Sequence, residues 1–175
     1  LPYFGYFQLI SETNHFLLHD DLQYTKKGWI NRNRFLLNNH SNIFTVATEK
    51  SAHTYLIGEK KVSEQFCRIA LLRKFFSAYK KAPYFKKHFP IIEEIVLFEN
   101  NFLFQYIEHS IFKICKLLEI NTNILRSSSL HLGSHLKRED RVITMCQKKG
   151  ATEYINSANG KNLYSKERFR FHGIH

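Results

Sequence analysis

The chain has 175 residues, of which 43% are hydrophobic and 23% charged, so it can bury one substantial core, and we expect a single domain over residues 1–175. It contains no uncharged run of about eighteen apolar residues and does not open like a signal peptide, which argues against membrane spanning and export and favours a cytoplasmic location. The net charge of +11 predicts an anionic partner, such as nucleotide phosphates, an RNA backbone or an acidic membrane surface.

The first predicted strands lie in the N-terminal part of the chain. The opening LPYFGYFQLI is almost wholly aromatic and aliphatic and lacks an initiator methionine, from which we expect the natural start to be missing. The apolar run HFLLH at 15–19 is bounded by Asn14 and by the acidic pair at 20–21, as is typical of a buried strand with a polar C-terminal end. NIFTVAT at 42–48 predicts a second strand.

The middle of the chain predicts helices. Apolar residues recur at helical spacing from Val62 to Tyr79, with lysines and arginines between them. The helix should end near Pro83, because the residue before a proline avoids helical geometry. After Pro90 a second helical region follows, with a break predicted at 99–101.

The last third predicts a strand, a helix and another strand. The segment 123–130 indicates a short strand passing into a polar loop, and 137–149 a basic amphipathic helix closed by Gly150. A strand at 153–155 should follow. Helices that alternate with strands favour an α/β fold, here with a small, largely parallel, Rossmann-like sheet flanked by amphipathic helices, because parallel pairing requires long crossovers.

The segment DDLQYTKKGWINRNR at 20–34 is the first candidate site, because open α/β sheets bind ligands beyond the carboxyl ends of their strands. The aspartates could hold a metal or act as a base, the basic residues could clamp phosphate, the aromatic residues could stack on a base or sugar, and the amides could orient a sugar. The alternative is an ordered surface loop whose charges pair with one another. The candidates are Asp20 and Asp21 for catalysis, and Gln23, Tyr24, Lys26, Lys27, Trp29, Asn31, Arg32, Asn33 and Arg34 for binding.

Two later polar clusters add further candidate binding residues. SSSLHLGSH at 127–135, which contains Ser128, precedes a helix predicted to start near Leu136, whose free N–H groups could bind an anion. A Ser-His-Asp triad is rejected there because no G-x-S-x-G elbow exists, and serine-rich loops are common helix entries. The stretch at 150–164 offers Asn156 and Gly160 in a turn whose backbone N–H groups could meet phosphate or sugar hydroxyls, with a purely structural tight turn as the alternative.

Metal chemistry has little support in the sequence. The ten histidines show no H-E-x-x-H spacing, and the close pair His131 and His135 lies in a polar loop. We therefore expect no metal site, and the residues do not indicate a particular cofactor.

Several stretches together resemble the WbqC-like protein family over essentially the whole chain: PYFGYFQLI, DDLQYTKKGWINRNR, AYKKAPYF and KKGATEYINSANGKNLY. The second stretch is the most specific. Family members usually begin with a strand and a Gln-Pro-Tyr segment and continue beyond the final Gly-Ile, so we expect this chain to be truncated at both ends. Many also have a double glycine where this chain has Asn159 and Gly160.

The resemblance implies a product of gene clusters for O-antigen, lipopolysaccharide and related bacterial surface polysaccharides. The chain is also loosely similar to nucleotidyltransferase-like α/β enzymes such as pantothenate synthetase, whose His-x-x-His element it lacks. From this context and the residues at 20–34 we predict an acyl- or aminoacyltransferase that modifies a nucleotide-linked amino sugar, with an acyl donor or an aminoacyl-tRNA as second substrate. The alternative is a non-catalytic binding or scaffold protein that docks assembly enzymes or an anionic membrane through its basic helices.

Overall fold

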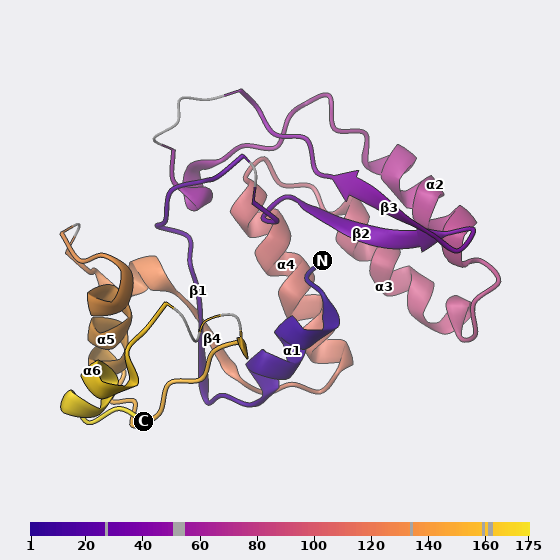
Figure 1. Cartoon of the computed structure of the whole chain (residues 1–175). Coiled ribbons are helices and arrows are strands. Elements are labelled where there is room, and N and C mark those ends of the chain that lie inside the picture. Colours follow the sequence, from indigo (N-terminus) through magenta and orange to yellow (C-terminus); the bar gives the residue numbers. More distant parts are fainter. Residues whose placement is uncertain (27, 51–54, 134, 159, 161–162) are drawn as a thin grey trace. The chain divides into compact units, whose positions relative to one another are not determined.

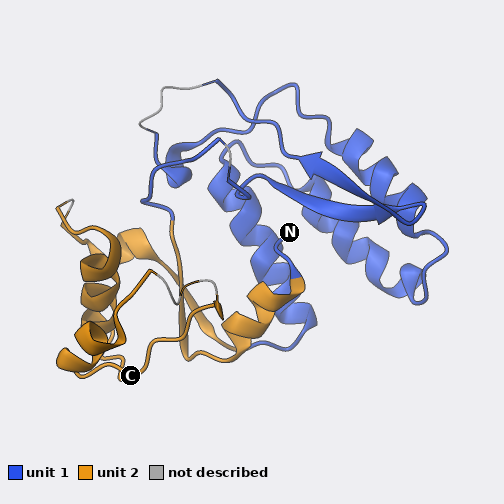
Figure 2. Cartoon of the chain, viewed as in Figure 1, with its two compact units in different colours: residues 1–3, 20–120 blue, residues 4–19, 121–175 orange. Residues whose placement is uncertain are grey.

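A computed structural model describes residues 1–26, 28–50, 55–133, 135–158, 160 and 163–175 (Figure 1). The chain forms two compact units, coloured separately in Figure 2: residues 1–3 with 20–120, and residues 4–19 with 121–175. The described elements are α1 (Phe4–Ser11), β1 (His15–Leu18), β2 (Arg32–Leu37), β3 (His40–Thr45), a 3₁₀ helix (Ile57–Glu59), α2 (Arg68–Tyr79), α3 (Phe85–Leu97), α4 (Leu103–Leu117), β4 (Asn123–Arg126), a second 3₁₀ helix (Ser127–Leu130), α5 (Arg138–Lys148) and α6 (Lys166–Phe171).

The first unit contains an antiparallel hairpin of β2 and β3. Two residues with positive φ, Asn38 and Asn39, form its turn, which asparagine tolerates better than most residues. Successive side chains of a strand point to opposite faces, so one face carries the phenylalanines and the other the arginines. On the inner face, the rings of Phe35 and Phe44 meet Phe75 of α2 edge to face, with centroids 5.4 and 5.1 Å from its ring.

Helices α2, α3 and α4 complete the core of the first unit. Arg68 at the start of α2 donates from Nε to the Phe98 carbonyl at 3.2 Å and from Nη2 to the Asn100 carbonyl at 3.1 Å, which ties α2 to the connection between α3 and α4. Tyr106 of α4 donates its hydroxyl to the Val96 carbonyl at 2.9 Å. The buried core residues are Phe35, Val46, Val62, Phe66, Leu71, Leu72, Phe75, Val96, Leu103 and Tyr106.

The second unit is built on the parallel pair of β1 and β4. Their register runs from His15 opposite Asn123 to Leu18 opposite Arg126, and residues 20–120 of the first unit lie between these strands in the sequence. Helices α5 and α6 pack around a separate apolar cluster. It contains Val142, Ile143, Cys146, Phe169 and Ile174.

The structure confirms the α/β class, with one parallel and one antiparallel strand pair among the described residues. The strand predicted at 15–19 is β1, and the segment 123–130 divides into β4 and a 3₁₀ helix. The predicted helix at 137–149 is α5, and Gly150 follows it at φ +61°. The strand predicted at 153–155 is wrong: Tyr154 donates its amide to the His175 carbonyl at 2.7 Å, but no described strand forms there.

Candidate functional site

The first part of the 20–34 segment is fixed to the chain around the first 3₁₀ helix. The Gly58 amide donates to the Asp20 carbonyl at 2.7 Å, and the Tyr24 amide to the Tyr55 carbonyl at 2.9 Å. A Cβ on Gly58 would lie 3.2 Å from the Asp20 carbonyl oxygen, so this close approach of two backbones favours glycine. The segment is therefore anchored through its backbone, and its side chains project from a defined path.

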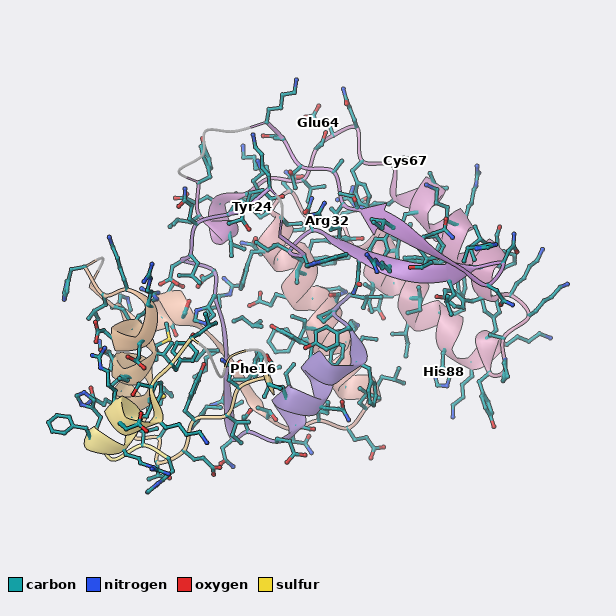
Figure 3. All side chains as sticks on the ribbon, viewed as in Figure 1. Phe16, Tyr24, Arg32, Glu64, Cys67 and His88 are labelled. Carbon is teal, nitrogen blue, oxygen red and sulfur yellow. The ribbon has the colours of Figure 1, made fainter. Side chains whose placement is uncertain are left out.

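The second part of the segment leads into β2 and forms a cluster of one indole and two guanidinium groups. Arg32 and Arg34 are two residues apart on the strand and share its outer face. Their guanidinium carbons lie 5.4 and 5.3 Å from the centroid of the Trp29 ring, within cation–π range. Arg32 also donates from Nε to the Gly28 carbonyl at 3.0 Å, which fixes its position. Figure 3 labels Arg32 where the segment enters β2, with Tyr24 on the part before it.

This cluster, the Trp29 cluster, has the chemistry of a site for an aromatic anion. Trp29 is 56% exposed, which is high for the largest apolar side chain. An exposed ring can stack on a planar ligand, and guanidinium groups recognise phosphate with paired N–H donors. The arginines already lie beside the ring, so little of their rotamer freedom would remain to be lost on binding.

The two asparagines of the segment have structural bonds. Asn31 is buried, and its Nδ2 donates to the Val46 carbonyl at 2.9 Å, which extends the connection between β2 and β3. Asn33 donates from Nδ2 to the Leu1 carbonyl at 2.7 Å and accepts the Arg34 amide at 2.8 Å. Burial argues against the predicted sugar contact of Asn31, because its amide would have to leave the protein to reach a ligand.

A buried lysine lies beside the same segment and was not predicted as a site residue. Lys60 is 2% exposed, its ammonium lies 5.2 Å from the centroid of the Tyr24 ring, and it donates to the Glu49 carbonyl. Burial lowers the pKa of Lys60, and the nearby charge of Lys26 lowers it further. No sequence signal distinguishes Lys60 from its exposed neighbour Lys61, because burial depends on tertiary packing.

The aspartates are half-buried, a position from which a carboxylate can meet a ligand. Asp20 and Asp21 follow β1 in the chain at the start of the 20–34 segment, and Gln23, after Leu22, is exposed. Gln23 makes an isolated antiparallel bridge with Leu56. Lys27, also predicted as a binding residue, lies outside the described residues.

The remaining predicted binding residues belong to the second unit. Ser128 is exposed in the 3₁₀ helix after β4, and its carbonyl accepts the His131 amide at 3.0 Å. Asn156 is exposed and donates from Nδ2 to the Tyr154 hydroxyl at 3.1 Å. Gly160 is buried, and a Cβ there would lie 2.5 Å from Asn156 Nδ2. Their roles in substrate binding stay predictions.

The N-terminus of α5 was a predicted anion site, but acidic side chains already occupy it. Glu139 and Asp140 lie in the first turn, and Arg168 donates to Glu139 at 2.8 Å and also to Asp140. Glu139 also accepts the Ser165 amide. These carboxylates compensate the helix dipole and would repel a bound anion.

The described residues contain neither a cluster of metal ligands nor a membrane-spanning helix. Among these residues, no three His, Cys, Asp or Glu side chains lie close enough together to hold a metal ion. Over the same residues, no helix is long and apolar enough to cross a membrane.

Comparisons with known proteins show the family of the chain. The model of the WbqC-like protein family matches residues 1–175. An uncharacterized protein of Mycobacterium tuberculosis is 28% identical over 171 residues, which cover 97% of this chain and 73% of the relative. No solved structure matches the chain.

Proposed function

The chain belongs to the WbqC-like protein family, and from that premise we propose that it is an acyl- or aminoacyltransferase acting on a nucleotide-linked amino sugar in the biosynthesis of surface polysaccharide such as O-antigen. The observation that carries the proposal is the Trp29 cluster, an exposed indole flanked by the guanidinium groups of Arg32 and Arg34. A nucleotide sugar offers the matching groups, an aromatic base next to a diphosphate.

The cluster supports a particular division of roles. Trp29 stacks on the base, and Arg34, the more exposed of the two arginines, pairs with the diphosphate together with Arg32. Tyr24 is the weaker candidate for stacking, because it is half-buried with the Lys60 ammonium near its ring. Asn33 and Gln23 remain proposed contacts to the sugar, and Lys26 adds positive charge close to Lys60.

In the proposed reaction the sugar amine attacks the carbonyl carbon of an activated acyl group. A carbon–nitrogen bond forms, and the bond from that carbon to the carrier sulfur or oxygen breaks. Asp20 or Asp21 accepts the proton released by the amine, and the departing thiolate or alkoxide takes up a proton from solvent. A thioester or an aminoacyl-tRNA ester would serve as the donor, and the family does not distinguish them.

The binding half of this proposal can be tested by calorimetry with a uridine-diphosphate-linked amino sugar and its thymidine-diphosphate counterpart. Arg34→Ala should weaken binding by about tenfold to a hundredfold, the range for losing charge-assisted hydrogen bonds. Arg73→Ala removes one exposed arginine from α2, which packs on the face of the β2–β3 hairpin opposite Arg34, and should leave affinity within about twofold, since an exposed charge outside the site is screened.

Equal losses of affinity in Arg34→Ala and Arg73→Ala would show that only the net charge of the protein matters, which would contradict the proposed site. If neither sugar bound the full chain at all, the nucleotide-sugar assignment would fail, and the non-catalytic scaffold reading would replace it.

A further inference from the structure

The second half of α2 and the first half of α3 carry a concentration of positive charge that the proposed site does not use. No acidic residue occurs between Glu64 and Glu93. Seven basic residues lie in that interval: Arg68, Arg73, Lys74, Lys80, Lys81, Lys86 and Lys87. Four of the lysines gather where the two helices are joined, and we call residues 76–89 the hairpin end.

The backbone of the hairpin end is held by its own hydrogen bonds. The Ala82 amide donates to the Tyr79 carbonyl at 2.8 Å, and the Lys87 amide to the Tyr84 carbonyl at 3.0 Å. Tyr84 has φ +61°, which positions α3 to run back along α2. The lysines are therefore displayed on an ordered turn. In Figure 2 this turn lies at an outer end of the first unit.

Two of these lysines occupy an unfavourable position for the helix itself. Lys86 and Lys87 lie in the first turn of α3, which has no acidic residue. The positive end of a helix dipole repels such charges, at a cost of several tenths of a kcal/mol each. The first turn of α5, with Glu139 and Asp140, follows the stabilising pattern instead. Local folding therefore does not explain the lysines of α3, whereas an external anionic surface does.

Exposed aromatic rings accompany the charge. Tyr84 at the turn is 75% exposed, and Phe76 is 46% exposed. Phe76 lies 5.5 Å from Phe85 and 5.6 Å from Phe89, so these three rings form an apolar cluster between the helices. Lysines around half-exposed aromatic rings are the composition of surfaces that sit at the headgroup level of a bilayer.

We propose that the hairpin end docks this protein on an anionic phospholipid bilayer. Lysine is a flexible point charge without the planar fork of arginine, so it suits the diffuse charge of a lipid surface. Arg68 is held by the Phe98 and Asn100 carbonyls and does not join the exposed set. The turn lies at an end of the first unit and exposes Tyr84. Such a projecting end fits a flat bilayer better than a nucleic-acid strand, which would have to wrap around it.

The test is sedimentation of the full chain with vesicles of phosphatidylcholine, with and without phosphatidylglycerol at about one lipid in three. We expect binding only to the anionic vesicles, weakening as salt is raised. Replacing Lys80, Lys81, Lys86 and Lys87 with glutamine should lower the partition coefficient on the order of a hundredfold. Tyr84→Ser, which changes no charge, should lower it about threefold to tenfold.

A matched control removes four exposed charges elsewhere, by replacing Lys116, Lys137, Lys166 and Arg170 with glutamine. It should bind nearly as well as the parent chain. Equal losses in the two quadruple variants would overturn the proposal, as would absence of binding to anionic vesicles at low salt. The proposal would also be overturned if a single-stranded RNA bound the lysines of the hairpin end more tightly than the vesicles did. Circular dichroism of each variant ensures that a loss of binding is not a loss of fold.

Discussion

The guanidinium carbon of Arg34 lies 5.3 Å from the centroid of the Trp29 ring. The contact depends on β2, because strand alternation places Arg34 on the outer face while Phe35 enters the core. Strand and segment together therefore hold a cation beside an exposed indole. The chain contains a single tryptophan, so its fluorescence reports directly on this place.

Nucleotide binding should change the tryptophan fluorescence. A base stacked on Trp29 replaces water at a ring that is 56% exposed, so we expect quenching and a shift of the emission maximum to shorter wavelength. Titration of the full chain with a uridine-diphosphate-linked amino sugar measures both. Trp29→Phe should remove the signal and keep most of the calorimetric affinity, whereas Trp29→Leu should weaken affinity by about tenfold. An unchanged spectrum at saturating ligand would place the ligand elsewhere.

The aspartates should affect turnover more than binding. Replacing Asp21 with asparagine keeps the side-chain shape but removes its capacity as a base, so turnover should fall by about a hundredfold or more while ligand affinity changes little. Asp20→Asn, measured in parallel, identifies which carboxylate accepts the proton. Normal turnover in both variants and in the double variant would exclude the aspartates as the base.

The contribution of Tyr106 to the free energy of unfolding should fall at alkaline pH. Burial raises the pKa of Tyr106 to about 12 from its ordinary value of 10.0. Between these values the folded chain retains a proton that the unfolded chain has lost, so the contribution of Tyr106 to stability is complete below pH 10 and falls as pH rises toward 12. Tyr106→Phe leaves the Val96 carbonyl without this donor and should cost about 1–2 kcal/mol at neutral pH.

Urea unfolding of the parent chain and Tyr106→Phe at several pH values measures the difference. The advantage of the parent chain should shrink by about 2 kcal/mol between pH 10 and pH 12. Both chains share Lys60 and the other titrating groups, so the contributions of these groups to the stability difference cancel to first order. A difference independent of pH would contradict the assigned titration.

Gly150 should contribute to stability only through its backbone conformation, which favours glycine. Its φ is +61°, and among the described residues none but its chain neighbours lies within 4 Å of a Cβ built there, so Gly150→Ala meets only the left-handed strain. We expect a loss of about 1 kcal/mol in the free energy of unfolding, measured by chemical denaturation. Gly150→Asn should cost less, because asparagine tolerates this region. Equal stability of all three chains would show that the turn relaxes.

The elements that the sequence predicts well are those set by local signals. Helix α2 ends at Tyr79, shortly before Pro83. The predicted break at 99–101 separates α3 from α4, although α3 begins at Phe85, earlier than expected, with Pro90 inside it. The predicted start at Val62 is six residues too early, because Val62 packs in the core from an extended segment. Apolar spacing alone does not distinguish a helix from an extended segment that packs in the core.

The candidate site was predictable in composition but not in arrangement. Trp29, Arg32 and Arg34 were expected as binding residues, yet their mutual contact depends on β2, which was not predicted. The alternation in RNRFLL and the Asn38–Asn39 turn were the available signals for that hairpin. The structural bonds of Asn31 and the burial of Lys60 arise from segments distant in sequence, which local patterns do not encode.

The most direct test of the proposed function is a mass-spectrometric assay of the purified protein with a nucleotide-linked amino sugar and a panel of donors. The panel contains acyl-coenzyme A, a free amino acid with ATP, and aminoacyl-tRNA. The proposal predicts that the sugar gains the mass of one acyl or aminoacyl group with one of these donors, and that Asp20→Asn or Asp21→Asn removes the gain. No gain with any donor, from folded protein that still binds the sugar, would contradict the transferase and favour a non-catalytic binding protein.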